Sequence, residues 1–235
     1  MLQFIGFGSA FNPKLGNTSA FIRRPNTMLL IDCGGTVFHQ LLQKDLLLEL
    51  IQLNIVITHT HPDHVGSLGD LIFYSHFGLR LKPVLYFPEP ELLRNLLNCL
   101  GVEPFMYELK GEPETRFSEG AFSGGMLRFL PVSHVAAIPA FGFFLELEGK
   151  RCYYSGDANH IDNEIIEMLE QGRLDLIYQD TCGADYDGNP HLSLQRLAAL
   201  VPQGLRNKVY CIHSDREFNR EVALKLGFNL VASGV

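Results

Sequence analysis

The feature that most constrains this chain is the run Thr58-His59-Thr60-His61-Pro62-Asp63-His64, which places three histidines and an aspartate within six residues. The run follows a short apolar segment, 54–58, that is typical of a buried strand. Residues two apart on an extended chain point the same way, so His59 and His61 can bind one metal ion. Asp63 and His64 follow where the chain turns into a helix, and they can face a second ion. Imidazoles and carboxylates suit zinc and its neighbours, so the run predicts a metal site.

The rest of the chain alternates strand-like and helix-like segments. Hydrophobic residues make up 46% and charged residues 19% of the 235 residues, enough apolar content for a sizeable core. Strands are expected at 2–5, 20–23, 28–32, 54–58, 84–87, 127–132, 141–146, 152–155, 174–179, 208–212 and 230–232. Helices are expected at 37–51, after the histidine run, where Asp63 is expected to cap the N-terminus, and at 91–100, 163–171, 193–200 and 219–226. Strands followed by strand–helix units, twice over, predict an α/β architecture with two packed sheets and helices outside. We expect a single domain over residues 1–235.

Composition argues against several classes of protein. No apolar run approaches the roughly 20 residues that a membrane span needs, and the N-terminus lacks the features of a signal peptide, so a cytoplasmic protein is expected. The five cysteines include no C-x-x-C pair, which favours reduced, buried thiols. A formal net charge of −7 argues against a nucleic-acid polymer as the main partner.

The histidine run is the H-x-H-x-D-H motif of the metallo-β-lactamase superfamily, and the whole chain, 1–235, resembles that family. The family's later ligands match His134, Asp157 and His213, each at the end of an expected strand, and Asp32-Cys33-Gly34-Gly35 matches an early family element. The resemblance implies an αββα sandwich of two mixed sheets flanked by helices. It implies two divalent metal ions, zinc foremost and manganese as the alternative. The implied ligands are His59, His61 and His134 for one metal, Asp63, His64 and His213 for the other, and Asp157 as the bridge, with Asp32 orienting the histidine loop without binding metal.

A second cluster narrows the resemblance to one branch. Asp180-Thr181, followed by His191 before an expected helix, is similar to the phosphodiesterase branch that includes the tRNA 3′-processing endonucleases. The resemblance puts His191 and Asp180 at catalytic positions, together with Asp63. Here Asp-Thr stands where the endonucleases usually carry Glu-Ala-Thr, so the carboxylate has a shorter reach. An imidazolium held by a carboxylate can protonate the alkoxide that leaves a broken phosphate ester.

Size and charge favour a small substrate. Residues 103–125 are short and acidic, and the chain lacks a long basic arm for gripping tRNA. The chain looks most like small cyclic-nucleotide phosphodiesterases, including the phage anti-Pycsar enzymes that destroy cyclic mononucleotide immune signals, and their bacterial relatives. This implies hydrolysis of 3′,5′-cyclic nucleotides such as cyclic CMP, UMP, AMP or GMP to nucleoside monophosphates, a homodimer, and a place in the host cytoplasm if phage-encoded.

Four alternatives to this function stay open, together with the role of one aromatic residue. A tRNA 3′-processing endonuclease and another small-molecule metallo-hydrolase are the nearest alternatives. Diiron redox chemistry is disfavoured because that branch has Glu where this chain has His61, and an inactive metal-binding module is disfavoured because no ligand is lost. In the loop 8–13, Phe11 either offers a face for a nucleobase or belongs to the core, and the core reading is preferred.

Overall fold

A computed structural model describes residues 2–234, which form two compact units. The first unit comprises the chain up to Pro113 together with Ser233 and Gly234, and the second comprises Glu114–Ala232. The expectation of a single domain stays a prediction. Within residues 2–234, no helix is long and apolar enough to cross a membrane.

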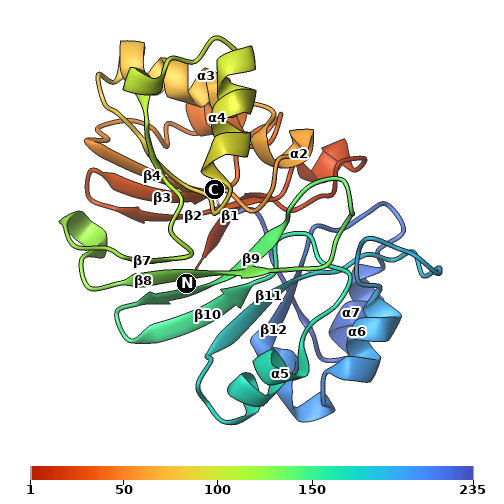
Figure 1. Cartoon of the computed structure of the whole chain (residues 1–235). Helices are drawn as coiled ribbons and strands as arrows, with labels where there is room; N and C mark the ends of the chain where they lie inside the picture. Colours follow the sequence, from red (N-terminus) through yellow and green to blue (C-terminus); the bar gives the residue numbers. More distant parts are fainter. Residues whose placement is uncertain (1, 235) are drawn as a thin grey trace. The chain divides into compact units, whose positions relative to one another are not determined.

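The first unit is built on a mixed sheet of six strands in the order β1-β2-β3-β4-β5-β6. Strands β1 to β4 are labelled in Figure 1. Its strands are β1 (Gln3–Gly6), β2 (Ser19–Arg24), β3 (Thr27–Ile31), β4 (Gln52–Val56), β5 (Val84–Tyr86) and β6 (Glu108–Lys110). β1, β2 and β3 pair antiparallel, whereas β3, β4, β5 and β6 pair parallel. Parallel strands end at one edge of a sheet, so the residues that follow β3 and β4 become neighbours.

The described residues of this unit also form four α-helices, two 3₁₀-helical turns and one π-helical turn. They are η1 (Pro13–Leu15), α1 (Val37–Gln43), α2 (Pro62–Val65), α3 (Leu68–Phe73), the π-helical turn η2 (Tyr74–Gly78), α4 (Pro90–Cys99) and η3 (Pro104–Met106). Their apolar faces are buried, including Val37 and Leu41 of α1 and Leu93 and Leu97 of α4. The spacing of these leucines is the helical periodicity that the sequence shows.

Two expectations for this unit are wrong. The helix expected over residues 37–51 ends at Gln43, because Asp45 and Glu49 adopt left-handed backbone conformations (φ 54° and 59°) that no α-helix contains. Asp63 was expected to cap the helix after the histidine run, but His61 occupies the cap position and no side chain makes a capping hydrogen bond there.

The second unit is a mixed sheet of seven strands in the order β13-β12-β11-β10-β9-β8-β7. Its strands are β7 (Glu114–Arg116), β8 (Met126–Pro131), β9 (Phe141–Leu147), β10 (Lys150–Tyr154), β11 (Leu176–Asp180), β12 (Val209–Ile212) and β13 (Asn229–Leu230). Strands β10 to β13 pair parallel, and β7 to β10 pair antiparallel. Since β8 and β10 are each antiparallel to β9, they run in the same direction, and β8, β10, β11 and β12 all end at one edge.

Helices α5 (Asn163–Glu170), α6 (Leu194–Leu200) and α7 (Arg220–Lys225) lie beside the β10–β12 part of this sheet in Figure 1. Shorter turns are η4 (Gly120–Phe122) and η5 (Gln203–Lys208). One apolar cluster joins the helices to the sheet, with Leu169 of α5, Leu197 of α6 and Val209 of β12 all buried in it. This core fixes the sheet edge from which the polar residues of the second unit project.

Candidate metal-binding residues and the acid-bearing segment

The histidine run forms a compact set of ligand atoms at the end of β4. His59 and His61 lie on an extended stretch, and Pro62 then begins α2, which brings His64 back beside His59. Nε2 of His59 lies 3.1 Å from Nδ1 of His61, and the rings of His59 and His64 have centroids 4.0 Å apart. Oδ2 of Asp63 lies 3.5 Å from Nε2 of His64. The first unit therefore brings together all four ligands predicted within the run.

Asp32 lies behind these histidines, where the sequence resemblance expects it. It is fully buried in a left-handed conformation (φ 58°) just after β3, and its carboxyl accepts hydrogen bonds from Thr58 N and Thr58 Oγ1, both at 2.8 Å. Nδ1 of His64 lies 2.8 Å from Asp32 Oδ2. Burial raises the pKa of Asp32, although the contacts with His64 and Thr58 oppose the rise. Because a carboxylate only accepts, His64 carries its proton on Nδ1 and leaves Nε2 for a metal.

Thr58 is a residue that sequence reasoning missed. Its buried hydroxyl donates to Asp32 and lies 3.0 Å from Nδ1 of His59. Since the hydroxyl proton is already committed to Asp32, the oxygen accepts from His59 Nδ1, which leaves Nε2 of His59 for a metal. In the sequence, this role could have been found from the position of Thr58 directly before His59, where a hydroxyl is within reach of that imidazole.

The glycine-bearing turn after Asp32 fixes the backbone of the histidine loop. The Cys33 amide donates to the His64 carbonyl at 2.7 Å, and the Gly35 amide donates to the Pro62 carbonyl at 3.2 Å. A Cβ atom on Gly34 would lie 1.9 Å from the Asp63 carbonyl oxygen, so only glycine allows this approach. The early Asp-Cys-Gly-Gly element thus supports the ligand loop through backbone contacts.

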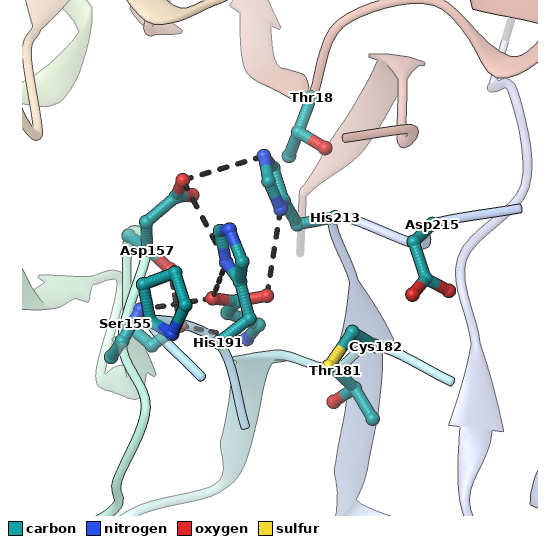
Figure 2. Close-up of polar contacts among 12 residues, drawn as sticks. Thr18, Ser155, Asp157, Thr181, Cys182, His191, His213 and Asp215 are labelled. Atoms are coloured by element: carbon teal, nitrogen blue, oxygen red, sulfur yellow. Dashed lines mark hydrogen bonds and ion pairs between the residues drawn. The ribbon is translucent and has the colours of Figure 1, made fainter. Parts of the chain in front are cut away.

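The second unit collects its polar residues at the ends of parallel strands (Figure 2). Asp157 follows β10, Asp180 ends β11 and His213 follows β12, and each of these three side chains is almost fully buried. Asp157 Oδ2 lies 3.4 Å from His213 Nε2 and 3.8 Å from His134 Nε2. Ligand atoms of Asp157, Asp180, His191 and His213 all lie within 4.8 Å of one another. His213 adopts a left-handed conformation (φ 59°), which turns its side chain at the strand end.

His191 lies beside this group on the segment between β11 and α6. Its Nδ1 lies 2.7 Å from Asp180 Oδ2 and 4.0 Å from Asp157 Oδ2. Figure 2 marks the contact between His191 and Asp157 with a dashed line. Its side chain is about one-quarter exposed (25%), so Nε2 is the nitrogen available to a bound molecule. Burial lowers the pKa of His191, but the charge and hydrogen bond of Asp180 outweigh burial and raise that pKa above its ordinary value. The pairing of Asp180 with His191 is therefore present despite the shorter carboxylate.

Asn189 fixes the backbone at His191 through its side chain. Sequence reasoning did not single it out. Its buried side chain accepts a hydrogen bond from the His191 amide at 3.0 Å and donates to the Ala184 carbonyl at 2.9 Å. Two residues after His191, Ser193 caps α6 by accepting from the Arg196 amide. The sequence signal for Asn189 was its place in Asn-Pro just before the histidine, a combination typical of turns.

The donor atoms fit divalent metal ions such as zinc. Nδ1 of His64 faces the Asp32 carboxylate, and Nδ1 of His134 faces the Pro190 carbonyl at 3.0 Å, so both carry protons there. Each of these histidines therefore directs an unprotonated Nε2 toward the carboxylate of Asp63 or Asp157. An outer hydrogen bond that fixes the tautomer is typical of metal-binding histidines. Both units thus offer neutral imidazoles and a carboxylate in a form suited to zinc or manganese.

The remaining predictions have simpler outcomes. Phe11 is 83% exposed on its loop, so the preferred reading of Phe11 as a core residue is wrong. Cys33, Cys152, Cys182 and Cys211 are buried free thiols, as expected, whereas Cys99 is exposed, contrary to that expectation. Burial raises the pKa of the Cys152 and Cys211 thiols to about 12, which makes both thiols unreactive at neutral pH.

This chain is similar to known proteins in both sequence and fold. The family model described as "Anti-Pycsar protein Apyc1" matches residues 1–233. A protein of that name from Paenibacillus harenae is 30% identical over 224 residues, covering 90% of this chain and 88% of the relative. Its namesake from Bacillus phage vB_BsuM-Goe3 is 42% identical over 236 residues, with the same coverage. The metallo-beta-lactamase fold protein YhfI from Bacillus subtilis superposes with a TM-score of 0.78 at 16% identity, covering 100% of this chain and 97% of YhfI. The predicted metallo-β-lactamase fold, with two mixed sheets and flanking helices, is thereby confirmed.

Proposed function

We infer the function from the family and the site: this chain belongs to the Apyc1 family of anti-Pycsar proteins, and its described residues include groups of His and Asp side chains whose ligand atoms lie close enough together to hold a metal ion. Family and fold together support a metal-dependent hydrolase. We propose that the chain hydrolyses 3′,5′-cyclic nucleotides, such as cyclic CMP or UMP, to nucleoside monophosphates. The main support for this proposal is the pairing of His191 with the buried carboxylate of Asp180 at 2.7 Å, beside the ligand group of the second unit.

We propose that the ligand set implied by the family resemblance holds two divalent metal ions. His59, His61 and His134 would hold one, Asp63, His64 and His213 the other, and Asp157 would bridge them. Two such ions would supply a water nucleophile at neutral pH and positive charge for the phosphate oxygens. The outer contacts of Asp32, Thr58 and Pro190 support this assignment, because they leave the inward nitrogens of His64, His59 and His134 unprotonated.

In this scheme His191 is the general acid. Breaking the P–O bond of a cyclic nucleotide releases a ribose oxygen that needs a proton. The Asp180 carboxylate holds Nδ1–H of His191 and stabilises the imidazolium, so Nε2–H can donate to the leaving oxygen. The raised pKa of His191 keeps more of the protonated acid at neutral pH.

The charge of the chain and the exposed ring of Phe11 support a small anionic substrate over an RNA polymer. The net charge of −7 and the acidic stretch 103–119 repel a long polyanion. Phe11 offers an exposed aromatic face on the loop 8–18, and that loop is tied to the turn beside the histidine run: Asn17 and Thr36 exchange hydrogen bonds of 2.8 and 2.9 Å. A nucleobase can stack on such a ring.

The test is a substrate panel assayed with zinc and with manganese. It contains cyclic mononucleotides of all four bases, cyclic dinucleotides and a precursor tRNA, and products are separated by chromatography. We expect nucleoside monophosphates from the cyclic mononucleotides and no tRNA cleavage. Cleavage of the precursor tRNA without cyclic-nucleotide hydrolysis would instead establish the endonuclease alternative, which the same ligand set and His191 would also serve.

A further inference from the structure

One carboxylate in the second unit faces two histidines of different proposed roles. Oδ2 of Asp180 lies 2.7 Å from Nδ1 of His191, while Oδ1 lies 3.5 Å from Nδ1 of His213. Asp180 is fully buried. Its position is fixed on both sides, since its amide donates to Ser155 Oγ and its Oδ2 accepts from the Ala158 amide.

The ring of His213 lies between the carboxylates of Asp157 and Asp180. The ring turns Nε2 toward Asp157, at 3.4 Å, and Nδ1 toward Asp180. A carboxylate behind one ring nitrogen keeps the proton on that side and leaves the other nitrogen free to bind a metal. Asp180 thus lies behind His213 as Asp32 lies behind His64, but at a longer distance, 3.5 Å against 2.8 Å.

The segment that carries the acid also contacts a further ligand. The Pro190 carbonyl, directly before His191, lies 3.0 Å from Nδ1 of His134. The rings of His134 and His213 flank His191, with centroid distances of 5.1 and 4.9 Å. The acid and two metal ligands are therefore packed as one group, with Asp180 as the buried charge that two of them share.

We propose that Asp180 is a positioning residue for the metal ligand His213 as well as for the acid His191, so that metal affinity and proton donation depend on one carboxylate. The inference uses the metal ligands of the proposed function and does not require that the substrate be a cyclic nucleotide. Loss of an outer partner of this kind typically weakens metal binding by about 10- to 100-fold. Loss of the acid alone has no such effect.

The test compares Asp180→Asn with His191→Ala in the full-length protein. Zinc affinity is measured by competition with a chromophoric chelator, and the cobalt-substituted proteins are compared by visible absorption. We expect Asp180→Asn to bind zinc about 10-fold or more weakly and to shift the cobalt spectrum, while His191→Ala keeps wild-type affinity. The matched control is Asp187→Asn, the same change at a fully exposed carboxylate on the same segment, which should leave affinity unchanged.

Wild-type zinc affinity in folded Asp180→Asn would overturn the proposal and leave Asp180 as a partner of His191 alone. If the Asn variant fails to fold, Asp180→Glu carries the same test, because a carboxylate displaced by one methylene cannot keep both contacts. At least fivefold weaker zinc binding in that variant supports the proposal, and wild-type affinity contradicts it. Failure of the proposed function would be seen separately, as wild-type protein that binds zinc but does not hydrolyse cyclic nucleotides.

Discussion

Thr58 contributes a single hydroxyl that joins Asp32 to His59. Thr58→Val keeps the shape of the side chain but removes this bond and leaves a buried Asp32 oxygen with one fewer donor. We expect a free energy of unfolding lower by about 1–3 kcal/mol and zinc affinity lower by about 10-fold, measured by denaturation and chelator competition. Thr58→Ser, which retains the hydroxyl, should restore most of both. Equal zinc affinity in the Val variant and the wild type would show that His59 needs no outer partner.

His191 is expected to act in proton transfer and not in metal binding. His191→Ala should reduce kcat on a cyclic nucleotide by about 10²- to 10⁴-fold, the usual contribution of a general acid, while bound zinc per chain stays unchanged. Steady-state kinetics and metal analysis check the two halves of this prediction. His39→Ala, at an exposed histidine in α1, is the matched control and should behave as wild type. Turnover near the wild-type rate in His191→Ala would remove the acid role.

Sequence reasoning identified side chains with ligand chemistry more readily than the residues that orient them. The predicted ligands of the run can be recognised by their spacing, because His59, His61 and His64 are close along the chain. Thr58 and Asn189 act through partners brought together by folding: Thr58 meets Asp32 across the β3–β4 pairing, 26 residues away. A threonine or an asparagine is common in any loop, so its type carries little information until that pairing is known.

Among the elements, most strands were predicted, but the short strands β6 and β7 and the turn after α1 were not. Apolar runs such as β4 and β11 lie within two residues of their expected positions, because buried parallel strands are nearly all apolar. The helix over 37–51 was overextended because leucines continue past Gln43 in a turn that reverses through left-handed Asp45 and Glu49. Leu41 and Leu47 are both buried, so the apolar pattern was correct even where the helix was not.

A further prediction concerns the loop 8–13, where Phe11 could stack on a nucleobase. Its turn is held by the Asn12 amide bonded to the Ser9 carbonyl at 3.0 Å, and Phe11 projects from it with 83% exposure. If a base stacks there, Phe11→Ala should raise KM for cyclic nucleotides by about 5- to 150-fold, the equivalent of about 1–3 kcal/mol of stacking, with kcat nearly unchanged. Phe11→Tyr should retain the wild-type KM. The exposed Phe77 provides the control, Phe77→Ala, and an unchanged KM in Phe11→Ala would exclude stacking on this ring.

For the molecule as a whole, metal binding should stabilise the fold. Ions that bind only the folded chain oppose its unfolding. At metal concentrations about 1,000 times Kd, one ion adds about 4 kcal/mol, and removal with a chelator should lower Tm by roughly 10 °C for a chain of this size. Differential scanning calorimetry with and without added zinc checks this. An unchanged Tm after complete metal removal would contradict a structural contribution of the ions.

The assembly state is the second prediction at this scale. Family resemblance implies a homodimer, and light scattering coupled to size-exclusion chromatography should therefore give the mass of two chains. A mass of one chain across micromolar concentrations would contradict the dimer without affecting the ligand assignment.

The central claim is that water attacks phosphorus in a cyclic nucleotide while His191 protonates the ribose oxygen that leaves. The most direct test is hydrolysis of a 3′,5′-cyclic mononucleotide by the zinc-loaded protein in water enriched in oxygen-18, followed by mass spectrometry of the product. We predict a nucleoside monophosphate that carries one heavy oxygen, located on its phosphate. Heavy oxygen on the ribose, or no monophosphate from any cyclic mononucleotide, would contradict the claim.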